Sequence, residues 1–270
     1  MRSPATAGAA SAGSGYRSAA RRCREALALP GGAHLRLAET IPPHVGLGSG
    51  TKLALAVAQA LATLHGRTVD APTLAQAAGR AGRSAVGMWT FALGGLVVEG
   101  GVRHGAERPA PLLMRQAMPD EWRIVLVVPR AEPGLSGVAE TQAFGRLVPS
   151  AERSAAIAHL VLTSLLPALV ERDLQEFGGA LTRVQRLVGD AFAPVQGGRF
   201  HPRAGALVEA LLRGGAAGAG QSSWGPAVYG IVGSEAAGRE LARRMEDVVG
   251  GEGSVEVATF DNRGARVERS

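Results

Sequence analysis

Pro42-Pro43-His44-Val45-Gly46-Leu47-Gly48-Ser49-Gly50-Thr51 stands directly before an Ala- and Leu-rich run, Lys52 to His65. Ala and Leu are strong helix formers and the run is apolar nearly all round, so it predicts a buried helix. Glycines let the backbone adopt positive φ and approach a ligand closely. The helix offers its first-turn N–H groups and the positive end of its dipole. We therefore expect a phosphate-binding loop that comprises Gly46, Gly48, Ser49, Gly50, Thr51 and Lys52.

The alternative reading of this stretch is a glycine-rich turn that only caps a core helix. The order of a strand-like segment (Ala33–Thr40), prolines, glycines, hydroxyl residues and a long helix favours phosphate. The loop is neither a Walker A motif nor a dinucleotide-binding fingerprint, because both spacings are absent. Lys52 is the only lysine of the chain, and its ammonium either contacts the phosphate or faces solvent.

The composition limits the classes of protein to which the chain can belong. Its 270 residues are 46% hydrophobic, enough for the core of one large domain or two small ones. The net charge of +6 comes from scattered arginines and only 4% of residues are aromatic, so nucleic-acid binding is not favoured. The single cysteine, Cys23, excludes an internal disulfide. No apolar run reaches the length of a membrane span. We expect a cytoplasmic protein without membrane attachment.

Periodicity and turn residues predict an α+β chain behind a disordered tail at 1–15. The expected strands are Ala33–Thr40, Leu96–Glu99, Arg123–Val128, Ala227–Val232 and Ser254–Thr259. The expected helices are Tyr16–Leu29, Lys52–His65, Ala71–Arg80, Ala151–Glu171 with a kink at Pro167, Asp173–Val188, Pro202–Arg213 and Glu235–Val248. Asp70 and Ser150 are expected helix caps. We expect a domain boundary between 149 and 150, which gives domains at 16–149 and 150–270.

The glycine loop resembles the phosphate-binding motif of the GHMP kinase superfamily. A second motif of that superfamily reads Pro-Ser-Gly-Ile-Asp, followed seven residues on by Gly-Gly, and its aspartate is the catalytic base. The corresponding residues here are Ser84, Ala85, Val86 and Gly87, then Gly94 and Gly95, and the resemblance makes Ser84 and Gly87 candidate substrate-binding residues. Gly87 falls on the aspartate, and a glycine cannot remove a proton from an alcohol. The resemblance therefore implies a kinase scaffold that lacks the kinase base.

Two further segments carry candidate substrate-binding residues. Gly215–Pro226 corresponds to the C-terminal glycine-rich loop that closes over phosphates in the superfamily. It offers Gly218, Gly220, Gln221, Ser222 and Ser223. Gln185–Phe200 reads as a polar loop after a helix. It offers Gln196, Asp190 as a loop cap or cation ligand, and Arg199 as a fork for a carboxylate or phosphate. A plain glycine-rich turn and simple helix termination remain the alternatives.

Together these segments resemble one branch of the superfamily, the β-ribofuranosylaminobenzene 5'-phosphate synthases. The most specific stretches are Phe192–Phe200 and Gln221–Pro226. That family condenses phosphoribosyl pyrophosphate with 4-aminobenzoate or 4-hydroxybenzoate, releasing CO2 and pyrophosphate, in methanopterin biosynthesis. The resemblance implies that the glycine loop holds the pyrophosphate, with Mg²⁺ as its partner. It also explains the lost aspartate, because no hydroxyl needs deprotonation.

The resemblance also implies the fold. It predicts a GHMP-kinase-like two-layer α+β fold, with an N-terminal part like domain 2 of ribosomal protein S5 and a ferredoxin-like C-terminal part. The first strands of that fold have no counterpart here, so we expect a chain that begins late. Two other functions stay open: an ATP-dependent small-molecule kinase with a different base, and a non-catalytic phosphate-ligand or nucleic-acid binder. A homodimer is an open expectation for the assembly.

Overall fold

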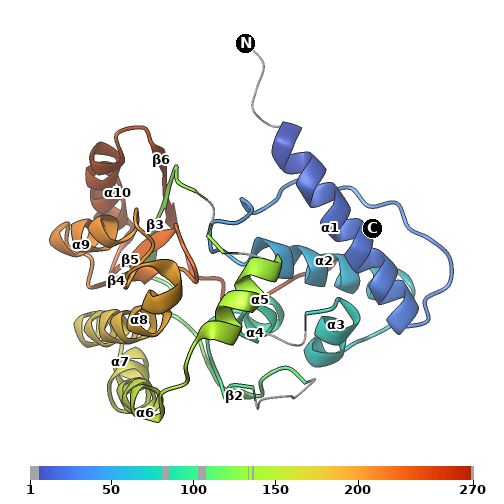
Figure 1. Ribbon diagram of the computed structural model, residues 1–270, viewed down its shortest axis with the longest axis horizontal. Helices are drawn as coiled ribbons and strands as arrows, with labels where there is room; N and C mark the ends of the chain where they lie inside the picture. Colours follow the sequence, from blue (N-terminus) through green and yellow to red (C-terminus); the bar gives the residue numbers. More distant parts are fainter. Residues whose placement is uncertain (1–5, 81–84, 103–107, 133, 136, 269–270) are drawn as a thin grey trace. The chain divides into compact units, whose positions relative to one another are not determined.

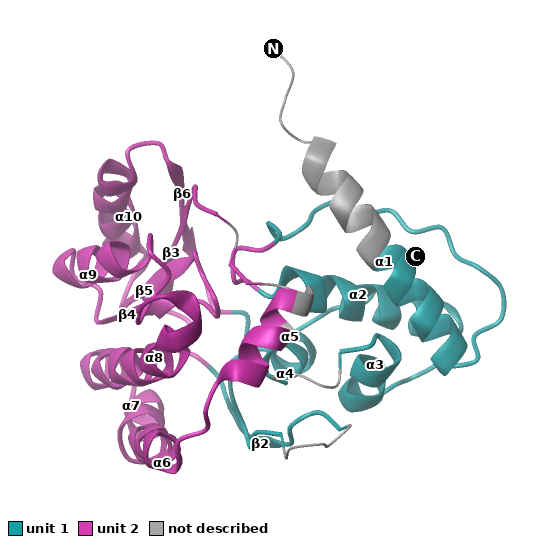
Figure 2. Cartoon of the chain, viewed as in Figure 1, with its two compact units in different colours: residues 1–43, 48–117, 261–270 teal, residues 44–47, 118–260 magenta. Residues whose placement is uncertain are grey.

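The computed structural model describes residues 6–80, 85–102, 108–132, 134–135 and 137–268. The chain forms two compact units (Figure 2). Unit 1 contains 1–43, 48–117 and 261–270, and unit 2 contains 44–47 and 118–260. The division differs from the predicted boundary at 149–150, because the strand at 123–129 pairs with strands near the C-terminus.

The described part of unit 1 contains four helices and an antiparallel strand pair. Figure 1 shows these helices together. The helices are α1 (Thr6–Ala26), α2 (Ser49–Leu64), α3 (Ala71–Ala77) and α4 (Val86–Leu93), and the strand pair joins β1 (Leu96–Glu99) to β2 (Leu112–Gln116). Asp70 caps α3 as predicted, because its carboxylate accepts from the N–H of Thr73 at 2.8 Å. Helix α1 includes part of the stretch at 1–15 that the sequence predicts to be a disordered tail.

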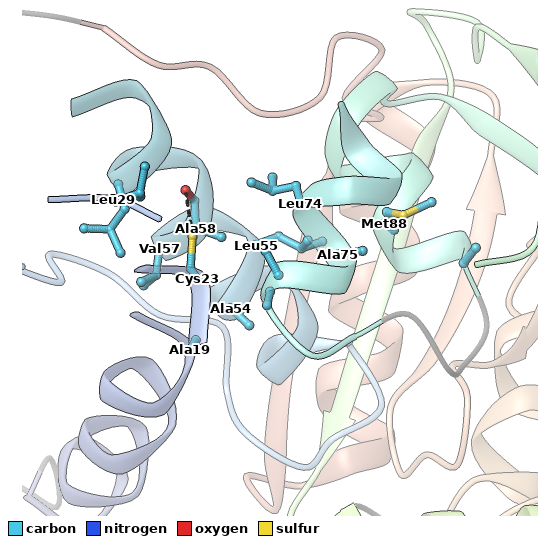
Figure 3. Packing of buried hydrophobic residues seen from close by; sticks show 14 of the residues in the cluster. Ala19, Cys23, Leu29, Ala54, Leu55, Val57, Ala58, Leu74, Ala75 and Met88 are labelled. Carbon is cyan, nitrogen blue, oxygen red and sulfur yellow. Dashed lines mark hydrogen bonds between the residues drawn. The ribbon is translucent and has the colours of Figure 1, made fainter. Parts of the chain in front are cut away.

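The core of unit 1 is built around α2, as its Ala- and Leu-rich sequence predicts. Leu55 and Ala58 of α2 are fully buried against Leu74 of α3 and Met88 of α4. Figure 3 shows the Cys23 thiol of α1 pointing at the Ala58 carbonyl oxygen, 3.7 Å away. Burial raises the pKa of this thiol, so it stays protonated and serves as a core residue.

Unit 2 is an antiparallel sheet covered by helices. Its strand order is β4-β5-β3-β6, with bounds Gly218–Gln221, Val228–Val232, Arg123–Pro129 and Gly253–Ala258. Helices α9 (Gly205–Arg213) and α10 (Glu235–Val249) pack on one face of the sheet, over Val125, Val127 and Val228 (Figure 1). The other helices of unit 2 are α5 (Gly137–Arg146), α6 (Ala151–Leu160), a π-helical turn η1 (Val161–Leu165), α7 (Leu166–Glu171) and α8 (Leu174–Gln196).

Helix α8 closes the free edge of β4. The Thr182 hydroxyl accepts from the Ala219 N–H at 3.0 Å, so an edge donor of the strand is paired. A Cβ on Gly218 would lie 2.2 Å from the backbone oxygen of Gly178, which explains why both positions are glycine. Gly178, Thr182 and Gln185 recur at helical spacing and form the face of α8 that meets this edge.

The helical segment at 151–171 differs from the prediction in one respect. The helix is interrupted by the π-helical turn η1 and not by a kink at Pro167. Pro167 lies in the first turn of α7, where its missing N–H costs little. The three helical pieces form one run of 21 residues that is long and apolar enough to cross a membrane by length and composition alone. It is the one such run among the described residues and is by itself weak evidence.

Three predicted elements are wrong. Ala33–Thr40 forms no strand, because no described strand pairs with it. Gln185–Gln196 is not a loop but the second half of α8, where Gly189 and Pro194 are tolerated near the helix end. Gly218–Gln221, predicted to lie within a glycine loop, is strand β4, because its small residues permit the close approach of α8.

Candidate phosphate loop and adjoining site

The loop before α2 has the backbone geometry that its glycines predict. Gly46 and Gly48 have φ values of 92° and 67°, in the left-handed region that favours glycine. Gly48 is the N-cap of α2 and no side chain caps this helix end. The Gly48 carbonyl accepts from the N–H groups of Thr51 at 3.1 Å and Lys52 at 3.0 Å. A Cβ on Gly48 would meet nothing within 4 Å, so the space beside the helix N-terminus is open.

Lys52 does not face open solvent. Its ammonium lies 3.3 Å from the Thr90 hydroxyl of α4, and that hydroxyl donates to the Val86 carbonyl at 2.7 Å. Burial lowers the pKa of Lys52, and the Asp261 carboxylate partly opposes that shift. The phosphate contact of Lys52 stays a prediction. The structure supports a half-buried cation beside the first turns of α2 and α4.

Gly87 lies in the first turn of α4, beside the phosphate loop. A Cβ at this position would touch only the Thr51 methyl group, at 3.4 Å. The Glu99 carboxylate accepts from the Ala85 N–H at 2.5 Å, at the N-terminus of α4. Glu99 is not singled out by sequence reasoning, although its position at the end of the predicted strand could have pointed to it. Ser84, a predicted substrate residue, lies outside the described residues.

Gly94 and Gly95 allow the C-terminal segment of the chain to pack closely against their backbone. The Gly95 N–H donates to the Asp261 carbonyl at 2.7 Å, and a Cβ on Gly94 would lie 2.4 Å from the same oxygen. Both glycines also have positive φ. The glycine pair of the second motif therefore serves a close approach of backbone to backbone.

The first half of the phosphate loop is bonded to the turn that follows β4, within unit 2. The Ser222 hydroxyl donates to the Gly46 carbonyl at 2.9 Å, and the Ala227 N–H donates to the Val45 carbonyl at 3.1 Å. The Gly134 N–H donates to the His44 carbonyl at 3.0 Å. The structure thus brings together two glycine-rich segments that the sequence separates by more than half of its length.

Gln221 joins the end of β4 to the segment after α8. Its side chain is 6% exposed and its amide donates to the side-chain oxygen of Gln196 at 3.3 Å and to the Ser223 carbonyl at 2.8 Å. Its oxygen accepts from the His201 N–H at 2.6 Å. Three of its hydrogen-bonding positions are therefore used within the protein, so Gln221 holds the turn in place.

The Arg199 guanidinium forms a two-point contact with the Asp190 carboxylate, at 2.6 and 3.2 Å. This contact raises the pKa of Arg199. The Gln196 amide donates to the Arg199 carbonyl at 2.7 Å, which fixes the same turn. The predicted fork for a ligand carboxylate is occupied by Asp190 in the described structure. Both side chains stay about half exposed, at 49% and 40%.

Gly218 and Gly220, two predicted substrate-binding residues, lie within strand β4. Both are buried in β4, and a Cβ on Gly220 would lie 2.4 Å from the Gln185 side chain of α8. Their observed role is packing against α8. The predicted substrate contacts of these two residues have no support in the geometry.

Sequence reasoning also missed His201 and an aromatic cluster. The His201 Nδ1 atom accepts from the Arg203 N–H at 3.3 Å, and burial lowers the pKa of the imidazole, so its neutral form is favoured. The Trp224 ring stacks on Phe192 with centroids 4.2 Å apart and meets the edge of Phe144 at 5.3 Å. The Trp224 indole N–H is buried and has no hydrogen-bond partner among the described residues.

The described residues contain no group of three or more His, Cys, Asp or Glu side chains that could hold a metal ion. Carboxylates are therefore not gathered into a cage. A cation at the phosphate loop would need oxygen ligands from the bound phosphate groups and from water.

Comparison with known proteins places this geometry in a family. Residues 15–95 match the model of the GHMP kinases N terminal domain, and residues 165–250 match that of the GHMP kinases C terminal domain. A beta-ribofuranosylphenol 5'-phosphate synthase of Archaeoglobus fulgidus is 36% identical over 252 residues, which cover 88% of this chain and 77% of that protein. The enzyme of that name from Methanothermobacter thermautotrophicus is 31% identical over 261 residues, covering 92% and 77%.

Solved structures show the same fold at lower identity. A homoserine kinase of Cytophaga hutchinsonii superposes with a TM-score of 0.70 at 19% identity, covering 93% of this chain and 77% of that one. The mevalonate kinase of L. major gives 0.67 at 15% identity, covering 96% and 80%. This likeness confirms the predicted GHMP-kinase-like α+β fold and carries no inference about substrates.

Proposed function

Because the chain belongs to the family of beta-ribofuranosylphenol 5'-phosphate synthases on the GHMP kinase fold, we propose that it transfers phosphoribosyl groups to a benzoate. The donor is phosphoribosyl pyrophosphate and the acceptor is 4-hydroxybenzoate or 4-aminobenzoate, in the cytoplasmic biosynthesis of methanopterin. Pyrophosphate leaves C1 of the ribose, and the ring carbon that carries the carboxylate attacks C1. The bond to the carboxylate then breaks, its electron pair restores the aromatic ring, and CO2 leaves.

The observation that carries this proposal is Gly87 in the first turn of α4, beside Thr51 of the phosphate loop. A kinase needs a base there to deprotonate the acceptor hydroxyl, whereas attack by a ring carbon with loss of CO2 needs none. The relatives at 31% and 36% identity are named for a ribofuranosylphenol 5'-phosphate, which fits the same acceptor chemistry.

The phosphate loop supplies the stabilisation that this reaction requires. Pyrophosphate gains negative charge as its bond to C1 breaks. The open N-terminus of α2 and the half-buried ammonium of Lys52 provide fixed positive potential. We propose that Mg²⁺ enters as the complex with the pyrophosphate group, because the described residues offer no carboxylate cage. That metal neutralises phosphate charge when it is bound.

The test uses the whole chain with carboxyl-labelled 4-hydroxybenzoate or 4-aminobenzoate, phosphoribosyl pyrophosphate and Mg²⁺. We expect labelled CO2 and pyrophosphate to appear in equal amounts, with one benzoate preferred. A parallel reaction with ATP and a panel of sugar and isoprenoid alcohols serves as the kinase control. ATP turnover without CO2 release would replace the proposed transferase with a kinase. If neither product formed, both activities would be rejected.

A further inference from the structure

We propose that Ser222 is a positioning residue for the phosphate loop, and that its hydroxyl aims the loop's N–H groups without contacting the ligand. The proposal rests on the proposed function, since it names a residue that shapes the same pyrophosphate site. The Ser222 hydroxyl donates to the Gly46 carbonyl at 2.9 Å across 176 residues of sequence. Both residues belong to unit 2, whose sheet fixes the turn that carries Ser222.

The peptide bond explains how this contact acts. In a trans peptide the C=O and the following N–H point in opposite directions. A hydroxyl that fixes the Gly46 carbonyl therefore also fixes the Leu47 N–H, which points away from Ser222. None of the described residues accepts a hydrogen bond from the N–H of Leu47, Ser49 or Gly50. No described acceptor therefore competes with an anion for these donors, and Ser222 sets the direction of the first of them.

Backbone bonds hold the His44 and Val45 carbonyls, and among the described contacts the Ser222 hydroxyl is the one that holds the Gly46 carbonyl. Gly46 has a φ of 92° and lies in no helix or strand. A glycine at this φ can change conformation at little cost. Ser222 itself is fixed, because its N–H donates to the Ala227 carbonyl and its carbonyl accepts from the Gly225 N–H, both at 2.9 Å. The turn after β4 therefore holds the Gly46 carbonyl through the Ser222 hydroxyl, next to the backbone bonds that hold the His44 and Val45 carbonyls.

The neighbouring Ser223 provides a matched control. Ser223, a substrate-binding candidate on sequence alone, is exposed, and no described group bonds to its hydroxyl, so the structure gives that hydroxyl no part in holding the loop. Its carbonyl accepts from the Gln221 amide, a bond that a change of side chain leaves in place. Ser222→Ala and Ser223→Ala therefore remove the same atom from adjacent positions, and only one removal frees the Gly46 carbonyl.

The experiment measures pyrophosphate affinity by calorimetry for the parent, Ser222→Ala, Ser223→Ala and Ser222→Thr, with melting temperature and amide exchange of residues 46–50. We expect Ser222→Ala to weaken pyrophosphate binding about five- to tenfold. Pyrophosphate should also lose its protection of the loop amides, while the KM for the benzoate stays unchanged. Ser223→Ala should bind within about twofold of the parent. Ser222→Thr, which keeps the hydroxyl, should restore most of the affinity.

Three results would overturn the proposal: parent affinity in Ser222→Ala, equal weakening in both alanine variants, or a parent that binds no pyrophosphate. The second would mean that both hydroxyls touch the ligand. A parent that binds pyrophosphate and shows the expected Ser222 effect but releases no CO2 would leave the positioning role in place. That outcome would reject the proposed reaction alone.

Discussion

The ammonium of Lys52 and the hydroxyl of Thr90 lie 3.3 Å apart and join the first turn of α2 to α4. Burial lowers the pKa of this lysine below the ordinary value of 10.5. Between the lowered pKa and 10.5 the unfolded chain binds more protons than the folded one, so the stability of the folded state rises with pH across that window. At neutral pH the charged group therefore opposes folding.

Lys52→Gln should lose this pH dependence, because an amide can keep a hydrogen bond to Thr90 without a charge. The experiment measures the free energies of unfolding of parent and variant in urea. As the pH rises from about 7 to about 10, we expect their difference to shift in favour of the parent. A constant difference across this range would mean that the ammonium is solvated. If the ammonium contacts phosphate, pyrophosphate binding at neutral pH should weaken by about 1 kcal/mol in Lys52→Gln.

Gly87→Asp restores the carboxylate that a kinase of this superfamily carries. The structure has room for it, since a Cβ meets only the Thr51 methyl group, and an acid near the start of α4 is favourable. We expect stability within about 0.5 kcal/mol of the parent. Pyrophosphate binding should weaken about tenfold, because the new charge lies beside the phosphate loop.

Gly87→Asn is the control, because it has the same shape without the charge. It should bind pyrophosphate nearly as the parent does in calorimetry. Equal weakening in both variants would assign the effect to size and would contradict the electrostatic argument. Gain of ATP-dependent phosphorylation in Gly87→Asp alone would show that the scaffold still supports kinase chemistry.

Gly46→Ala and Gly48→Ala separate backbone strain from steric conflict. Both residues have positive φ, which costs an alanine roughly 1–2 kcal/mol. A Cβ on Gly46 would also lie 2.1 Å from the Ser222 carbonyl oxygen, whereas one on Gly48 meets nothing. We expect urea unfolding to show a loss of about 1 kcal/mol for Gly48→Ala and at least about 3 kcal/mol for Gly46→Ala. Equal losses would mean that the turn at Ser222 moves aside.

Trp224→Phe should cost little stability for so large a buried residue. The change removes an indole N–H that has no partner among the described residues, a gain of about 1–3 kcal/mol, and keeps a ring stacked on Phe192. The smaller ring loses contacts of similar worth, so we expect the net change in unfolding free energy to lie within about 1 kcal/mol. A loss of several kcal/mol would show that the N–H is hydrogen-bonded in solution.

The sequence predicts elements well where the signal is local. The Ala- and Leu-rich α2, the caps at Asp70 and Ser150, and the Val-rich β3 all follow from residue chemistry within a few positions. The motif spacing also predicts the left-handed glycines of the phosphate loop. These features need no knowledge of distant partners.

The failures come from contacts between distant segments. Strand β4 reads as a glycine loop until α8 is seen against its edge, where Gly218 admits the Gly178 backbone and Gly220 admits the Gln185 side chain. Gln185–Gln196 reads as a loop because Gly189 and Pro194 usually end helices, yet Gly189 admits the Arg199 backbone at 2.3 Å from a Cβ position. Two further contacts also depend on tertiary structure. They are the ion pair between Asp190 and Arg199 and the hydrogen bond from Ser222 to Gly46.

Gly48→Val tests whether the loop before α2 is the phosphate site. We predict that the backbone N–H groups at this helix end are the principal donors to phosphate, and a Cβ on Gly48 enters open space beside them. A valine there would carry two methyl groups into the space that a phosphate would occupy. Gly48→Ala is the control, because it places a Cβ at the same positive φ without those methyl groups, and the β-branched valine is the more strained of the two.

We expect Gly48→Val to bind pyrophosphate at least about tenfold more weakly than Gly48→Ala in calorimetry. Melting temperatures should lie close together, because this exposed loop position contributes little to the core of unit 1. Weak binding in both variants would assign the loss to a change in loop conformation. Parent-like binding in Gly48→Val would place the phosphate site elsewhere, and the transferase proposal would then lose its leaving-group site.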